Sequence, residues 1–112
     1  MGFVHHSVYP VWFEMARTEL LRKSGIAYAS IEQAGLYIVV VNLELRYHKP
    51  ARYDELLDVT ATLVRSAGVR IEHHYLVSRD GEKLVTGATT LACINREGKP
   101  LPVPDQLYYD PA

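Results

Sequence analysis

Two adjacent histidines, His5 and His6, stand directly before the one long helix-like segment of the sequence. The first turn of a helix presents amide groups without intrahelical partners and a partial positive charge, so an oxygen that develops negative charge there is stabilised. An imidazole titrates near neutral pH and can carry a proton. This combination suits acyl transfer, although the two histidines could instead only cap and solvate the helix entry.

The segment from Val8 to Lys23 is predicted to be this helix, about 24 Å long at 1.5 Å per residue. Ser7 is the expected N-cap, and Ser24-Gly25 is expected to end the helix. Glu14 with Arg17 or Thr18, and Glu19 with Lys23, have the spacing of ion pairs or polar pairs on a solvated flank. The expected apolar stripe, with Phe13 and Leu21 at its edge, follows Val8, Trp12, Met15, Ala16, Leu20 and Lys23.

After a short helical turn expected within residues 27–34, the apolar period changes to two, which predicts strands near residues 36–47, 57–63, 69–77 and 84–95. Asp80-Gly81 is a strong hairpin signal between the last two. In the first strand, one apolar face is expected to comprise Tyr37, Val39, Val41, Leu43, Leu45 and Tyr47. Its other face turns polar halfway, which suggests partial cover by another subunit. One long helix in the curve of a long antiparallel sheet gives an α+β fold.

Length and composition limit the function classes. The chain of 112 residues is 48% hydrophobic and has a formal charge of −1, which predicts one domain over residues 1–112 and no nucleic-acid or membrane partner. The single Cys93 is expected to be a small core residue, and it favours a cytoplasmic location because it cannot form an internal disulfide. No metal site or cofactor is expected, because His73 and His74 point to opposite faces of a strand.

Three blocks of sequence together resemble the hotdog-fold acyl-CoA thioesterases of the 4-hydroxybenzoyl-CoA thioesterase and YbgC type. The blocks are Gly2-Phe3-Val4-His5-His6-Ser7-Val8-Tyr9, then Trp12-Phe13-Glu14-Met15-Ala16-Arg17-Thr18-Glu19-Leu20-Leu21, and Tyr47-His48-Lys49-Pro50-Ala51-Arg52-Tyr53-Asp54. The resemblance covers nearly the whole chain. It implies a helix wrapped by a sheet, and hydrolysis of an acyl-CoA thioester at the interface of a homodimer or homotetramer.

The resemblance also implies a catalytic Asp seven residues before His6, a position that falls before Met1. We therefore expect the given chain to lack this carboxylate and most of the first strand, most simply because the sequence starts at an internal Met. A degenerate binding protein, or a substitute carboxylate such as Glu14, are the alternatives. The runner-up function is accordingly a non-catalytic module that binds acyl-CoA or an acyl carrier protein, and a dehydratase-like hotdog enzyme is a third.

Carried over by position, His6 is the expected catalytic residue, with its own amide and that of Ser7 polarising the thioester carbonyl. Tyr9 is expected to line the acyl pocket or to pack in the core. Arg65 and Arg70 flank a turn and are the candidates for binding the phosphates of CoA, with two solvated turn arginines as the alternative. Gly87 could let a pantetheine arm approach the backbone, or could mark a bulge.

Overall fold

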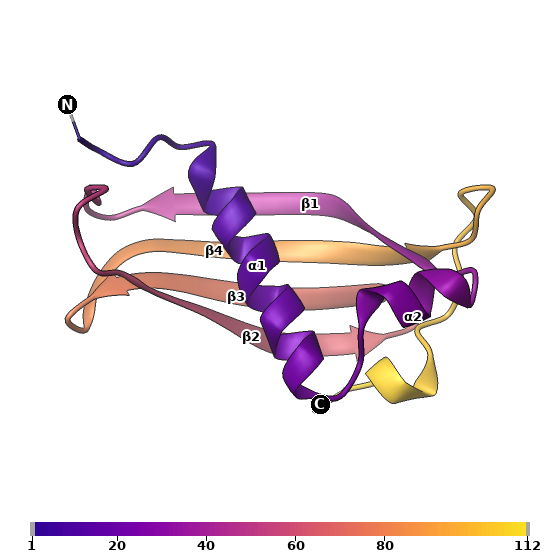
Figure 1. The fold of residues 1–112 in the computed structure, drawn as a ribbon. Helices are drawn as coiled ribbons and strands as arrows, with labels where there is room; N and C mark the ends of the chain where they lie inside the picture. Colours follow the sequence, from indigo (N-terminus) through magenta and orange to yellow (C-terminus); the bar gives the residue numbers. More distant parts are fainter. Residues whose placement is uncertain (1, 112) are drawn as a thin grey trace.

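A four-stranded antiparallel sheet, crossed on one face by a long helix, forms the body of the protein (Figure 1). The computed structural model describes residues 2–111. The order of strands in the sheet is β1-β4-β3-β2. The predicted α+β class and hotdog arrangement are confirmed. The elements are α1 (Val8–Lys23), α2 (Tyr28–Gln33), β1 (Tyr37–Tyr47), β2 (Asp58–Ala67), β3 (Arg70–Arg79), β4 (Glu82–Ile94) and a 3-10 turn at Asp105–Leu107.

Helix α1 runs obliquely over the sheet, with its N-terminus above the edge strand β1 and its C-terminus toward the opposite edge at β2 (Figure 1). Its bounds match the predicted ones, but its buried stripe consists of Tyr9, Phe13 and Arg17. Met15, predicted to be on the apolar stripe, has 63% of its surface exposed. The prediction was wrong by about one position around the helix, because it discounted a buried arginine that continues the line of the two aromatic residues.

The polar groups at the ends of α1 also differ from expectation. The Ser7 hydroxyl makes no cap hydrogen bond and lies 2.8 Å from Nδ1 of His5 instead. On the exposed flank, Arg22 forms an ion pair with Glu19, so the pair predicted between Glu19 and Lys23 is not formed. Arg17 is buried and therefore does not belong to a solvated flank. Gly25 has a φ of 85°, as expected where the helix ends.

A β-bulge in β1 changes which side chains face the helix. Val40 pairs with Leu91 of β4 and Asn42 pairs with Thr90, which leaves Val41 as the extra residue. The single apolar face predicted for this strand is therefore wrong. Before the bulge, the core contact comes from Ile38, which was assigned to the other face, and after it from Leu45.

Within residues 57–63 and 69–77 the next two strands follow the predicted alternation, but β2 continues past a second irregularity between Leu63 and Arg65 to Ala67, and the β3–β4 register shifts between Val77 and Ser78. In β3, the inward positions are buried and include His73 and Tyr75, while His74 is exposed. The hairpin at Asp80-Gly81 has φ of 51° and 82°, the left-handed pair that a two-residue turn of this kind requires. The expected short helix appears as α2. Cys93 is fully buried, as predicted for a core residue. Among the described residues, no helix is long and apolar enough to span a membrane.

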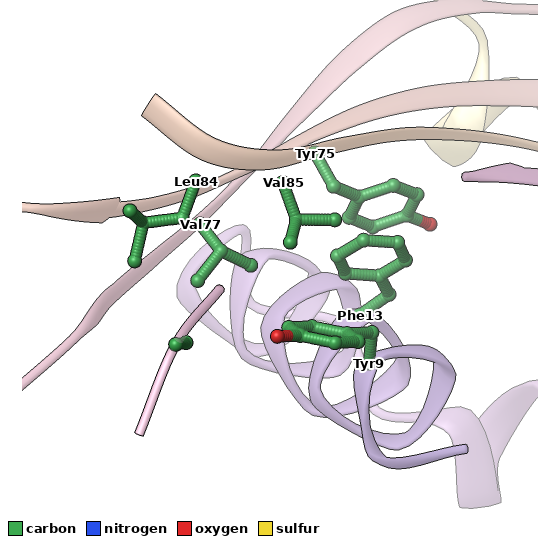
Figure 2. Packing of buried hydrophobic residues seen from close by; sticks show 7 residues of the cluster. Tyr9, Phe13, Tyr75, Val77, Leu84 and Val85 are labelled. Carbon is green, nitrogen blue, oxygen red and sulfur yellow. The ribbon is translucent and has the colours of Figure 1, made fainter. Parts of the chain in front are cut away.

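The core beneath the N-terminal half of α1 is aromatic. Phe13 is fully buried and its ring stacks on Tyr75 with 4.3 Å between centroids. Figure 2 shows Phe13 between Tyr75 and Tyr9, with aliphatic side chains of β3 and β4 beside them. A Cβ atom added at Gly87 would lie 2.8 Å from Cζ of Phe13 and 3.1 Å from the Glu44 carbonyl oxygen. Gly87 therefore accommodates a core ring, and the pairing register shows no bulge at this position.

We expect Gly87→Ala to destabilise the protein by about 2 kcal/mol, because the added methyl group overpacks a ring that cannot move away. The measurement is the free energy of unfolding from urea titration. In the double variant that also carries Phe13→Leu, the loss of unfolding free energy should be smaller than the sum of the losses in the two single variants, since the smaller side chain relieves the clash. Simple additivity would contradict this account of the glycine.

Candidate active site

A cavity of about 590 Å³ lies beside the N-terminus of α1, over the end of β1. Its walls come from the segment before the helix, from the first turn of the helix, and from the segment that follows β1. The lining residues are Phe3, Val4, His5, His6, Tyr9, Tyr47, His48, Lys49, Pro50 and Ala51. Two of the three sequence blocks that carry the predicted site therefore meet in space.

Backbone hydrogen bonds hold the two segments together. The Val4 amide donates to the Ala51 carbonyl at 2.8 Å, and the Tyr53 amide donates to the Gly2 carbonyl at 3.0 Å. The His5 amide donates to the Tyr53 hydroxyl at 3.2 Å. The histidine pair is thus fixed on a short bridged segment, which gives it a defined position relative to the helix end.

The amides of His6 and Ser7, both predicted to polarise the thioester carbonyl, differ in their hydrogen bonding. The Ser7 amide donates to Nδ1 of His5 at 3.2 Å, and the same ring nitrogen contacts the Ser7 hydroxyl. Within residues 2–111, the His6 amide has no hydrogen-bond partner. It can therefore donate a hydrogen bond directly to a carbonyl oxygen, whereas the Ser7 amide becomes free only when the His5 ring turns away.

Most charged or polar side chains around this cavity are basic. His5 and His6 stack with their ring centroids 4.1 Å apart, and His48 Nε2 lies 3.1 Å from the Thr86 hydroxyl. Lys49 forms an ion pair with Glu82 at 2.6 Å. None of the lining residues is Asp or Glu. Because Glu82 balances the charge of Lys49, an anion here, whether a carboxylate or a developing oxyanion, would be held by hydrogen-bond donors such as the His6 amide.

Tyr9 is a core residue, one of the two positions expected from the sequence, and it also lines this cavity. It is buried and makes edge-on contacts with Trp12 and Tyr47, with centroids 5.4 Å and 5.6 Å apart. Burial raises the pKa of its hydroxyl, and Tyr47 and Tyr53 raise it further. The hydroxyl therefore stays protonated and can serve as a hydrogen-bond donor but not as a base at neutral pH.

Arg65 and Arg70 do not lie near the histidines of the same chain. Across the sheet, Arg65 of β2 pairs with Glu72 of β3, and Glu72 pairs with Thr90 of β4. Thr90 in turn pairs with Asn42 of β1. Tyr47, which lines the cavity, is five residues further along β1, or about 17 Å at 3.3 Å per residue. Arg65 also forms an ion pair with Asp110 at 3.5 Å. One chain alone does not join the predicted phosphate site to the predicted catalytic residue.

Three residues near the histidines were given no role from the sequence: His48 and Lys49, which line the cavity, and Tyr53, which bonds to the His5 amide. They belong to the third block of the resemblance, so the signal was present, but only the fold shows that this block faces the histidines. Arg52 belongs to the same block. Its guanidinium lies over the Phe3 ring, 4.5 Å from the centroid, and helps to hold the segment before the helix.

His73, weighed above as a possible metal ligand, lies beneath α1 and away from this cavity. No group of three His, Cys, Asp or Glu side chains in the described part of the chain is arranged to hold a metal ion. Burial and, to a smaller extent, the charge of the nearby Arg17 lower the pKa of His73 from 6.5 to about 4. The folded protein therefore keeps this ring neutral.

This neutral histidine predicts a loss of stability in acid. Since the pKa is lower in the folded state, the stabilisation is complete above about pH 6.5 and falls as the pH drops toward 4, by roughly 3 kcal/mol in total. Urea titrations at several pH values measure it. His73→Gln should flatten the profile over this interval, while His74→Gln should leave it unchanged. An unchanged profile for His73→Gln would show that another group is responsible.

Comparison with known proteins gives a consistent set of matches. The sequence profile of the Thioesterase superfamily matches residues 1–86. The acyl-CoA thioesterase YbgC of Haemophilus influenzae is 32% identical over 103 residues, which are 91% of this chain and 75% of that protein.

Two solved structures have the same fold and comparable sequence identity. One is the DHNA-CoA thioesterase of Staphylococcus aureus, with a TM-score of 0.85 and 33% identity over 91% of this chain and 70% of that one. The other is the protein TT1821 of Thermus thermophilus, with a TM-score of 0.87 and 34% identity over 96% and 83% of the two chains.

Proposed function

Because this chain belongs to the Thioesterase superfamily, we propose that it hydrolyses an acyl-CoA thioester to a free acid and CoA at the cavity beside the N-terminus of α1. The observation that carries the proposal is the unpartnered His6 amide at a helix N-terminus within a basic cavity. The named relatives support acyl-CoA as the substrate, since YbgC is an acyl-CoA thioesterase and the Staphylococcus enzyme is named for DHNA-CoA.

In the proposed reaction, the thioester carbonyl oxygen accepts a hydrogen bond from the His6 amide. A water molecule, deprotonated by a carboxylate, adds to the carbonyl carbon, and the resulting oxyanion is stabilised by the helix N-terminus. The carbon–sulfur bond then breaks, and the thiolate of CoA leaves with the proton returned to it. The His6 ring is the group proposed to carry that proton, because it is exposed at the rim of the cavity.

The acyl group is proposed to lie against Tyr9 and Tyr47, the aromatic wall of the cavity. Arg65 and Arg70 of a neighbouring subunit are proposed to bind the phosphates of CoA, since those of the same chain lie too far along the sheet. The carboxylate is proposed to be the Asp implied seven residues before His6. We also propose a cytoplasmic location, because the lone Cys93 is buried as a free thiol.

The test is release of free thiol from a panel of short, long and aromatic acyl-CoAs, followed with a thiol reagent. The protein used includes any residues that the gene encodes before Met1. We expect turnover of at least one substrate. Tight binding of acyl-CoA without thiol release from any member of the panel would replace the enzyme by the non-catalytic binding module.

We propose that two copies associate through the edge of β1, as a homodimer or as half of a homotetramer. In the sheet described here, this strand pairs on one side only, with β4. Its exposed apolar residues are Val39, Val40, Val41 and Leu43. A long apolar edge of this kind pairs readily with another strand, and charge or proline normally protects an edge that stays free. The pairing would bring the N-termini of the two α1 helices to a shared interface (Figure 1).

We expect Val41→Lys to convert the oligomer to smaller species, because the side chain is 55% exposed on the proposed interface and a lysine there would be buried without a partner. Sedimentation velocity measures the change. Leu56→Lys is the matched control, since Leu56 is 94% exposed and lies outside the sheet. If both variants sediment like the unmodified protein, β1 is not the interface.

A further inference from the structure

A second cavity, of about 280 Å³, lies under the C-terminal half of α1, at the other end of the helix from the histidine pair. It is closed on one side by α2 and on another by the tail that follows the 3-10 turn. Half of its lining residues are Leu or Ile, and the polar ones include Arg17, Ser66 and His73.

These three polar groups are almost inaccessible to solvent. The exposed fractions are 9% for Arg17, 1% for Ser66 and 7% for His73. Neither the Ser66 hydroxyl nor Nδ1 of His73 has a hydrogen-bond partner among the described residues. Buried polar atoms are usually paired, so two unpaired atoms on residues that line one cavity point to a missing polar partner.

Arg17 adds a positive charge to this site. Its Nη1 donates a hydrogen bond to the Tyr75 hydroxyl at 3.5 Å, and Tyr28 is a second side-chain partner of the guanidinium. Within residues 2–111, no carboxylate lies at ion-pair distance from its guanidinium. A buried arginine is normally paired with an anion, because an uncompensated charge in a low-dielectric interior is costly.

We propose that this cavity is a second ligand site, which binds a small carboxylic acid with its carboxylate on Arg17 and Ser66 and its apolar body among the aliphatic walls. A guanidinium and a hydroxyl supply donors to the two oxygens, and a neutral imidazole beside them can donate one more hydrogen bond. At about 30 Å³ for each water-sized group, the cavity holds roughly nine non-hydrogen atoms, the size of hexanoate.

The site has a route of entry. Tyr108 and Tyr109 of the tail line its rim and are exposed. Tyr109 is tied to Ser66 by two backbone hydrogen bonds of 2.7 Å and 2.8 Å, so the tail and the Ser66 end of the cavity are joined directly.

The experiment is calorimetric titration of the full chain with hexanoate, with hexan-1-ol as the uncharged probe of similar shape. We expect one hexanoate per chain at this site and binding of hexan-1-ol at least tenfold weaker. Arg17→Met should weaken hexanoate binding at least tenfold and leave that of hexan-1-ol unchanged. Arg22→Met, on the exposed flank of the same helix, should bind both probes like the unmodified protein.

Further arms separate this site from the proposed active site. His6→Ala and saturating CoA should leave hexanoate binding unchanged, whether or not the protein hydrolyses acyl-CoA. Ser66→Ala, a smaller change than Arg17→Met, should weaken hexanoate binding about threefold in a protein whose circular dichroism spectrum is unaltered. Equal affinity for the two probes, no binding of hexanoate, or displacement of hexanoate by CoA would each overturn the proposal.

Discussion

Replacing His6 with alanine is expected to lower kcat for thioester hydrolysis about 100-fold and to change KM by less than about threefold. The reason is that the ring lies at the rim of the proposed reaction cavity, where it can transfer the proton that the departing thiolate needs, while the substrate is bound by other groups. The measurement is steady-state thiol release with the best acyl-CoA of the panel.

A matched control separates proton transfer from a structural effect. His74→Ala removes an exposed imidazole from the outer face of the sheet and should leave both constants unchanged. Added imidazole should restore part of the activity of His6→Ala, because a free base can enter the space that the ring occupied. A variant with unchanged kcat, or one that loses only substrate affinity, would remove His6 from the proposed mechanism and leave its amide as the contribution of this residue.

The largest effect on stability is expected for Phe13→Ala, at about 4 kcal/mol. Phe13 is fully buried, stacks on Tyr75 and fills the space above Gly87, so its removal leaves a cavity in the centre of the core (Figure 2). Equilibrium unfolding in urea, followed by circular dichroism, measures the loss.

Met15→Ala is the control on the same helix, and its expected cost is below about 0.5 kcal/mol because this side chain is mostly exposed. Phe13→Leu should fall between the two and keeps the test possible if the alanine variant does not fold. Similar costs at positions 13 and 15 would mean that the helix packs on the sheet through a different stripe.

Local signals in the sequence predicted the elements well. The bounds of α1, the turn at Asp80-Gly81 and the inward positions of β3 depend on helix periodicity, turn chemistry and strand alternation, all of which act over a few residues. The pattern failed where one residue departs from the regular period. The bulge at Val41 reverses the faces of β1 from that point, and periodicity alone contains no sign of it.

The site was predicted less completely, because contacts between distant segments decide it. The sequence placed His6 before the helix, but not the segment after β1 that forms the opposite wall. It also assigned Arg17 to the surface on the basis of its charge. The fold buries it on the line of Tyr9 and Phe13, because that stripe of α1 faces the sheet.

The bulge in β1 also affects how this strand can be compared between relatives. Val41 has no opposite residue on β4, and the positions on either side of it pair with Leu91 and Thr90, which are consecutive in the chain. A homologue lacking this one residue would keep every other cross-strand partner and every inward-facing position. A one-residue gap at Val41 in an alignment is therefore compatible with an identical core, whereas a gap elsewhere in the strand would exchange its two faces.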